Sequence, residues 1–232
     1  AGYLLQQFGG STTRQYIGYV IIFGIAMIAR IFSFIMLTKQ YEPEYKDDPG
    51  SYFSFFDFMK KARFNNYGMF VIYNSFMNFG VYLSGPFFTA YILKDLNLGY
   101  IDYTLIQAAA ILMRNISMPI WGKAMDRFGA RKVLTVAGFT MPIVPILWAL
   151  SHNFWYLIGV QLYSGFVWAA FDLATFTFIF DVTTPKKRAS CVAYFNVLNG
   201  ATMLAGAMIG GFILAKLPAD ALGSSFLVLF II

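Results

Sequence analysis

The chain is 232 residues long, 59% hydrophobic and only 12% charged, with a formal net charge of +6. A soluble domain carries about 25% charged residues, so this composition excludes an ordinary water-soluble protein. A nucleic-acid partner is not expected either, because apolar runs longer than ~18 residues, which suffice to cross a bilayer, divide the basic residues into short clusters. We therefore expect an integral membrane protein.

Seven apolar stretches follow one another along the chain. Each of the first six can cross ~30 Å of hydrocarbon at 1.5 Å per residue, whereas the last contains only the first turns of a span. Helices are expected, because an open sheet would leave backbone groups unpaired in lipid. The sequence thus predicts an all-α bundle of six to seven transmembrane helices in a fragment cut at both ends. The stretches lie near residues 17–37, 68–93, 102–121, 133–151, 154–181, 189–215 and 222–232.

Most connections are short, and the exception covers residues 38–67. It ends in an amphipathic segment over 55–64, in which aromatic residues stand beside Lys60, Lys61 and Arg63. Basic and aromatic residues together are typical of a helix that lies in the membrane interface. A flexible tether is the alternative.

The basic residues predict the orientation. Three of the 17 basic residues, Arg14, Lys94 and Lys216, fall in one set of alternate connections, and two lie inside spans. By the positive-inside rule the opposite set, which includes the long connection, faces the cytoplasm. That set contains Lys39, Lys46, Lys60, Lys61, Arg63, Lys123, Arg127, Arg131, Lys132, Lys186, Lys187 and Arg188.

The loop after the third span carries a motif. Residues 122–132 read Gly-Lys-Ala-Met-Asp-Arg-Phe-Gly-Ala-Arg-Lys. The spacing of a glycine, three residues, Asp-Arg, one residue, a glycine and a basic cluster resembles the signature loop of the major facilitator superfamily. That family commonly has arginine at the position of Ala130, and in this chain Arg131 follows.

A second resemblance follows the fifth span, where Asp181 precedes Pro185 and Arg188 ahead of a glycine-rich helix. A similar acid, proline and arginine lie between the fourth and fifth helices of a facilitator half. Together the two motifs imply half of a twelve-helix facilitator fold. The implied parts are the last helix of the N-terminal half with its preceding outer loop (1–37), the cytoplasmic central loop (38–67) and the C-terminal bundle, truncated in its last helix (68–232).

The resemblance also implies a cytoplasmic gate element. In the family the acid of this loop meets a helix N-terminus, whose partial positive charge favours anions, and holds the cytoplasmic side closed. The expected target here is the start of the sixth span near Ala189. The alternative is a basic loop that serves only topology. The gate candidates are Gly122, Asp126, Arg127, Gly129 and Arg131.

Ionisable residues inside spans are costly and indicate function. Asp172 of the fifth span and Arg114 of the third lie ~12–15 Å from the cytoplasmic ends of their spans at helical rise. Asparagines of the second and sixth spans reach a similar depth, which is where transporter sites lie. Gln161, Trp168 and Asp172 also share one helical face. We therefore expect a transport cavity lined by Asp172, Arg114, Asn74, Asn78, Trp168, Gln161 and Asn196. A purely structural pair of Asp172 with Arg114 is the alternative.

These features favour a secondary active transporter that moves a small solute by alternating access, as a symporter or an antiporter. Its expected partners are a small-molecule substrate, a coupling proton or sodium ion, membrane lipid and the N-terminal half of the same protein. Asp172 is the candidate carrier of a coupling proton, which a nearby Arg114 would oppose. A location in the cytoplasmic (plasma) membrane is expected.

Other function classes find less support in the sequence. An enzyme, a metal site and a cofactor are not expected, because the single His152 and single Cys191 form no catalytic or metal-ligating pattern. A membrane channel, or a non-transporting membrane protein of the same fold, is the alternative to a transporter.

Overall fold

The computed structural model describes residues 12–41 and 53–216 together with Phe226 and Phe230, with side chains described from Tyr19 onward. Every regular element among these residues is a helix, so the all-α prediction is confirmed. Most of the expected seventh span, the residues before 12 and residues 42–52 of the central loop lie outside the described residues.

The helices largely follow the predicted stretches. The first is α2 (Thr12–Leu37), and the long connection contains α3 (Phe55–Lys61) and the 3-10 turn η2 (Ala62–Phe64). The bundle then consists of α4 (Asn66–Ser84), η3 (Gly85–Phe87), α5 (Phe88–Ala90), η4 (Tyr91–Asp95), α6 (Tyr100–Phe128), α7 (Ala130–Thr140), α8 (Ile143–Leu150), α9 (Phe154–Val182) and α10 (Pro185–Lys216).

Four of the described helical segments are long and apolar enough to cross a membrane: Tyr19–Leu37, Ala130–Leu150, Phe154–Val182 and Pro185–Lys216. The two other complete spans expected from the sequence are helical but differ in character. The segment over 66–95 changes from α to 3-10 and π geometry beyond Ser84. Helix α6 has the length of a span, and Gln107, Arg114 and Asn115 make it more polar.

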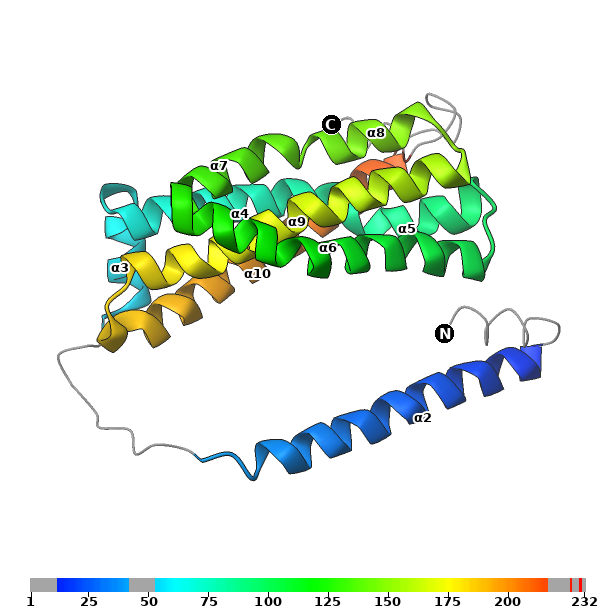
Figure 1. Ribbon diagram of the computed structural model, residues 1–232, viewed down its shortest axis with the longest axis horizontal. Coiled ribbons are helices and arrows are strands. Elements are labelled where there is room, and N and C mark those ends of the chain that lie inside the picture. Colours follow the sequence, from blue (N-terminus) through cyan, green and yellow to red (C-terminus); the bar gives the residue numbers. More distant parts are fainter. Residues whose placement is uncertain (1–11, 42–52, 217–225, 227–229, 231–232) are drawn as a thin grey trace.

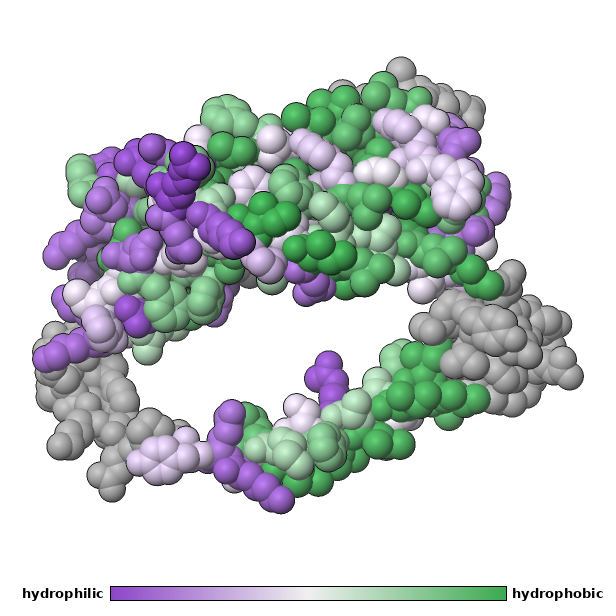
Figure 2. Space-filling model, in the orientation of Figure 1, coloured by the Kyte–Doolittle hydropathy of each residue, from purple (hydrophilic) through white to green (hydrophobic). Residues whose placement is uncertain are grey.

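The helices after residue 66 form one bundle, in which α6 packs along α9, α10 along α4, and α7 on α9 (Figure 1). Helix α2 lies apart from this bundle in Figure 1, and all but two of its residues with described side chains are exposed. Figure 2 shows hydrophilic residues gathered at the ends of the bundle, above all where α6 meets α7 and α9 meets α10, with apolar residues between. This distribution fits helices that cross a bilayer.

Small residues bring α9 close to its neighbours. Ala170 and Ala174 are fully buried on α9 and belong to the core that α9 shares with α4 and α7. At Gly165 an added Cβ would overlap the backbone carbonyl of Ala110 on α6. Such close approach is how helices pack in lipid, where the hydrophobic effect does not drive them together. The absence of a side chain at Gly165 therefore allows α6 and α9 to approach this closely.

The end of the long connection packs against the bundle. Phe58 and Ala62 are buried, and the Phe58 ring stacks on Tyr194 of α10 with 5.8 Å between ring centroids. Phe56 and Phe64 are exposed on the same segment. The segment expected to be an amphipathic helix is thus helical, and its place in a membrane interface stays a prediction.

Candidate functional site

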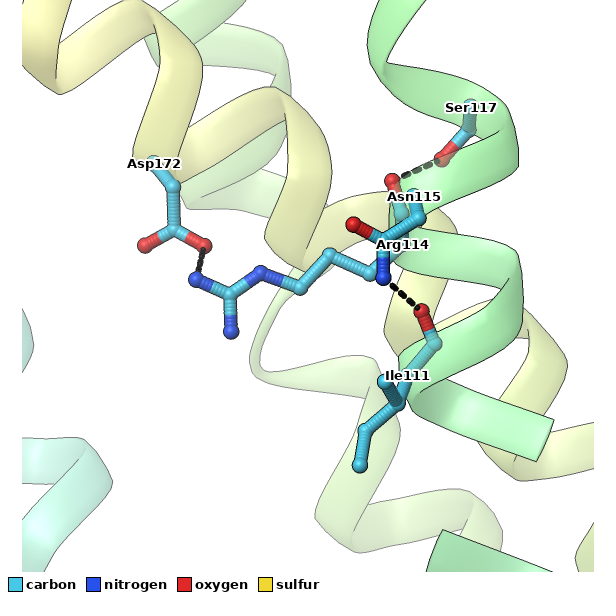
Figure 3. Close-up of polar contacts among 5 residues, drawn as sticks. All are labelled: Ile111, Arg114, Asn115, Ser117 and Asp172. Carbon is cyan, nitrogen blue, oxygen red and sulfur yellow. Dashed lines mark hydrogen bonds and ion pairs between the residues drawn. The ribbon is translucent and has the colours of Figure 1, made fainter. Parts of the chain in front are cut away.

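An ion pair joins the middle of α6 to α9. Arg114 lies at the midpoint of α6, about 21 Å from either end at 1.5 Å per residue. Its Nη2 contacts Oδ2 of Asp172 (Figure 3). The side chain of Arg114 is 46% exposed and that of Asp172 30% exposed. The pairing of these two residues, which the sequence left as the alternative to a cavity lining, is therefore present, and each side chain keeps part of its surface exposed.

The neighbours of Arg114 do not take part in this contact. Asn115 donates a hydrogen bond to the carbonyl of Ile111 at 2.7 Å (Figure 3). Ser117 is buried and donates to the carbonyl of Met113 at 2.7 Å. Both side chains are thus bonded within their own helix, and of the residues drawn from α6 only Arg114 reaches α9.

A cavity of about 440 Å³ lies beside the ion pair, between α4, α6, α8 and α9. Its size falls in the range of about 300–1,000 Å³ that is typical of small-molecule sites. Three predicted site residues, Arg114, Gln161 and Trp168, line it, and Asp172 stands outside the lining. The remaining lining residues include Tyr82, Ser84, Phe88, Gln107, Met141, Trp148, Ser164 and Gly165.

Two carboxamides that line the cavity are hydrogen-bonded to each other. Gln161 Nε2 donates to Gln107 Oε1 at 2.8 Å, which links α9 to α6. Gln107 was not among the residues predicted from the sequence. It lies seven residues before Arg114, which puts the two on one helical face, and this spacing was the signal that could have identified it.

The asparagines form a second polar cluster, away from the cavity lining. Asn78 Nδ2 donates to Asn74 Oδ1 at 2.7 Å and to Asn199 Oδ1 at 3.2 Å, and Asn74 donates to Thr175 at 3.1 Å. Asn74, Asn78 and Asn199 are all buried. The cluster ties α4 to α9 and α10, so its geometry is that of a structural network.

Asn196, which the sequence suggested for the cavity, is exposed on α10. Asn199, three residues further on, occupies the inward position instead. Residues three positions apart differ by about 60° around the helix axis, so the rotation of α10 about its own axis decides which of the two points into the bundle.

The loop after α6 has the turn that its glycine predicts. Gly129 adopts a φ of +84°, which an L side chain rarely adopts, and its N–H bonds to the carbonyl of Met125 at 2.7 Å. Gly122 is half-buried, whereas Asp126, Arg127 and Arg131 are exposed. The charged side chains of this loop therefore lie on the surface of the bundle.

The predicted contact of Asp126 with a helix start is not formed in this conformation. No hydrogen bond or ion pair joins Asp126 to another described residue. The expected target also differs, because α10 begins at Pro185 and not near Ala189. The gate role of this loop remains a prediction.

Within the described ranges, no group of three or more histidine, cysteine or acidic side chains could hold a metal ion. The groups gathered at the site are one cation paired with one carboxylate, two carboxamides, and aromatic rings that line the cavity beside the ion pair.

Comparisons with known proteins agree with this architecture. The family model described as Major Facilitator Superfamily matches residues 69–232. The Quinolone resistance protein NorA of Staphylococcus aureus (strain MRSA252) is 28% identical over 149 residues, which cover 63% of this chain and 38% of that protein. The Tetracycline resistance protein, class B, of Escherichia coli is 32% identical over 110 residues, covering 47% of this chain and 27% of that protein. The chain thus spans well under half the length of these relatives.

Proposed function

Since the chain belongs to the Major Facilitator Superfamily, we propose that it is part of a secondary active transporter that moves a small solute by alternating access. The chain is an integral membrane protein of all-α structure. The bacterial relatives favour the cytoplasmic (plasma) membrane as its location.

The observation that carries the proposal is the cavity beside Arg114 and Asp172. A charged side chain in the middle of a membrane helix is costly and is kept where it faces a partner, a cavity or a substrate path. Arg114 meets this condition twice, because it pairs with Asp172 and lines a cavity of small-molecule size. A cavity at this depth is where alternating access places a transported solute.

The residues around the cavity divide into two roles. Arg114, Gln107, Gln161 and Trp168 line it and contact the solute. Asp172 stands behind Arg114, where a coupling cation, a proton or sodium, competes with the guanidinium for the carboxylate. The named relatives are resistance proteins for quinolones and for tetracycline, which favours an organic compound of drug size as the solute.

Counterflow in proteoliposomes tests the function. The full-length protein is reconstituted with an unlabelled quinolone, tetracycline or other organic solute inside, and uptake of the labelled compound is followed. A transporter accumulates label transiently and returns it chemically unchanged. A channel gives equilibration without overshoot, and a non-transporting protein gives no uptake; either outcome would remove the proposal.

A further inference from the structure

Arg114 has hydrogen-bonding capacity that the part of the chain described by the structure does not use. A guanidinium carries five N–H donors in a planar fork. Apart from the ion pair with Asp172, no hydrogen bond joins this side chain to another described residue, and the side chain is 46% exposed. Because Arg114 also lines the cavity, its unused donors are available to a molecule bound there. A guanidinium with free donors matches a carboxylate or a similar planar acidic group.

Asp172 competes with such an acid. Its Oδ2 occupies one terminal nitrogen of Arg114, and it approaches from outside the cavity lining. An incoming acid must share the guanidinium with Asp172 or displace it, and the two negative charges repel each other. The ion pair therefore weakens the binding of acids to Arg114. A substitution that removes the charge of Asp172 would strengthen that binding.

The rest of the cavity favours a flat aromatic body. Trp168 lines it one helical turn before Asp172, and Phe88, Trp148 and Tyr82 contribute further rings. Aromatic pairs contribute about 0.5–1.5 kcal/mol beyond the burial of their area. The pair of Gln107 and Gln161 uses one donor and one acceptor between them, which leaves further amide groups for polar substituents.

We propose that the cavity takes an aromatic compound with an acidic group, which Arg114 binds in competition with Asp172. The inference rests on the proposed transport function for its biological meaning, since the cavity would then be the solute site. The recognition itself concerns binding and is tested without transport.

The test compares 2-naphthoate with its neutral counterpart 2-naphthamide, using calorimetric binding to the purified full-length protein. The wild-type protein binds the acid more tightly than the amide. Arg114→Gln loses about tenfold or more in affinity for the acid and little for the amide, because a hydrogen bond to a charged group is removed. Asp172→Asn binds the acid several-fold more tightly, because the competing carboxylate is gone.

Asn115→Leu is the matched control, because Asn115 is the neighbour of Arg114 and bonds only within its own helix. It leaves the affinities for both compounds unchanged. A single variant that strands a charge can fail to fold. The double variant Arg114→Gln with Asp172→Asn removes both charges together and is expected to bind acid and amide equally. All variants are checked by thermal unfolding and size-exclusion chromatography.

Three results would overturn the inference: equal affinity of the wild-type protein for acid and amide, weaker acid binding by Asp172→Asn, or an acid preference that persists in the double variant. Its failure is distinguishable from failure of the proposed function. Counterflow of a solute without any preference for acids would refute the inference and leave transport standing. Acid binding with the expected variant pattern, but no counterflow of any solute, would support the inference and refute the proposed transport function.

Discussion

Replacing Gly165 with alanine tests whether the close contact of α6 and α9 shapes the cavity. The added methyl group would overlap the backbone carbonyl of Ala110, and a backbone atom cannot turn aside as a side chain can. Overpacking of this kind costs about 1–3 kcal/mol. Because Gly165 also lines the cavity, moving α6 away would displace Arg114 from Asp172 and change ligand binding as well as stability.

Gly159→Ala provides the matched control on the same helix. An added Cβ at Gly159 meets no heavy atom within 4 Å. Both variants gain the same helix propensity, about 1 kcal/mol for glycine to alanine, so the difference between them isolates the clash. We expect the free energy of unfolding of Gly165→Ala to lie about 1–3 kcal/mol below that of Gly159→Ala.

Thermal and denaturant unfolding of the purified full-length variants measures this difference, and binding of 2-naphthoate measures the effect on the cavity. Gly165→Ala should show lower stability and lower affinity than Gly159→Ala. Equal stability and equal binding in the two variants would show that the contact with Ala110 does not set the helix spacing.

Three further predictions follow from the charged and polar residues outside the cavity. An introduced cysteine at Lys216 should react with an impermeant reagent added to intact cells and one at Lys187 should not, because the basic loops face the cytoplasm; the reverse pattern would overturn the orientation. Asp126→Asn should leave the fold intact but shift the cytoplasmic accessibility of cavity positions several-fold, since a charge at a helix N-terminus contributes about 0.3–2 kcal/mol; unchanged accessibility would remove the gate role. Asn78→Ala should lower the free energy of unfolding by about 1–3 kcal/mol, because it strands buried amide partners, whereas the exposed Asn196→Ala should stay within about 0.5 kcal/mol, and equal effects would contradict the network.

Composition and hydropathy were sufficient to predict the helical fold, because few residues other than apolar ones can face lipid. Arg114 and Asp172 could be singled out from the sequence, since a charge in an apolar run is conspicuous, and their depth in a membrane stays a prediction. What a single sequence does not contain is the rotation of one helix against another. The spacing of Gln107 from Arg114 could have marked it as a residue on the same helical face, but its hydrogen bond to Gln161 at 2.8 Å depends on how α6 and α9 face each other.

The same limit explains the asparagines. Asn196 and Asn199 are both polar residues in one apolar helix, and only the packing of α10 on α4 turns Asn199 toward Asn78. Some helices also begin at other residues than the apolar stretches predicted. Helix α10 begins at Pro185, before the apolar stretch at 189, because proline is favourable in the first turn of a helix. The sequence thus located most of the polar residues in apolar segments, and tertiary packing determined their partners.

The most direct test of the solute cavity is counterflow by the double variant Arg114→Gln with Asp172→Asn. If the ion pair serves only structure, removing both charges leaves neither group stranded, and a folded double variant transports as the wild-type protein does. If the cavity is the solute site, the double variant folds but loses counterflow of the solute that the wild-type protein carries. Loss of transport in a stable double variant is the result that we predict, and full transport would contradict the assignment of Arg114 and Asp172 to the solute site.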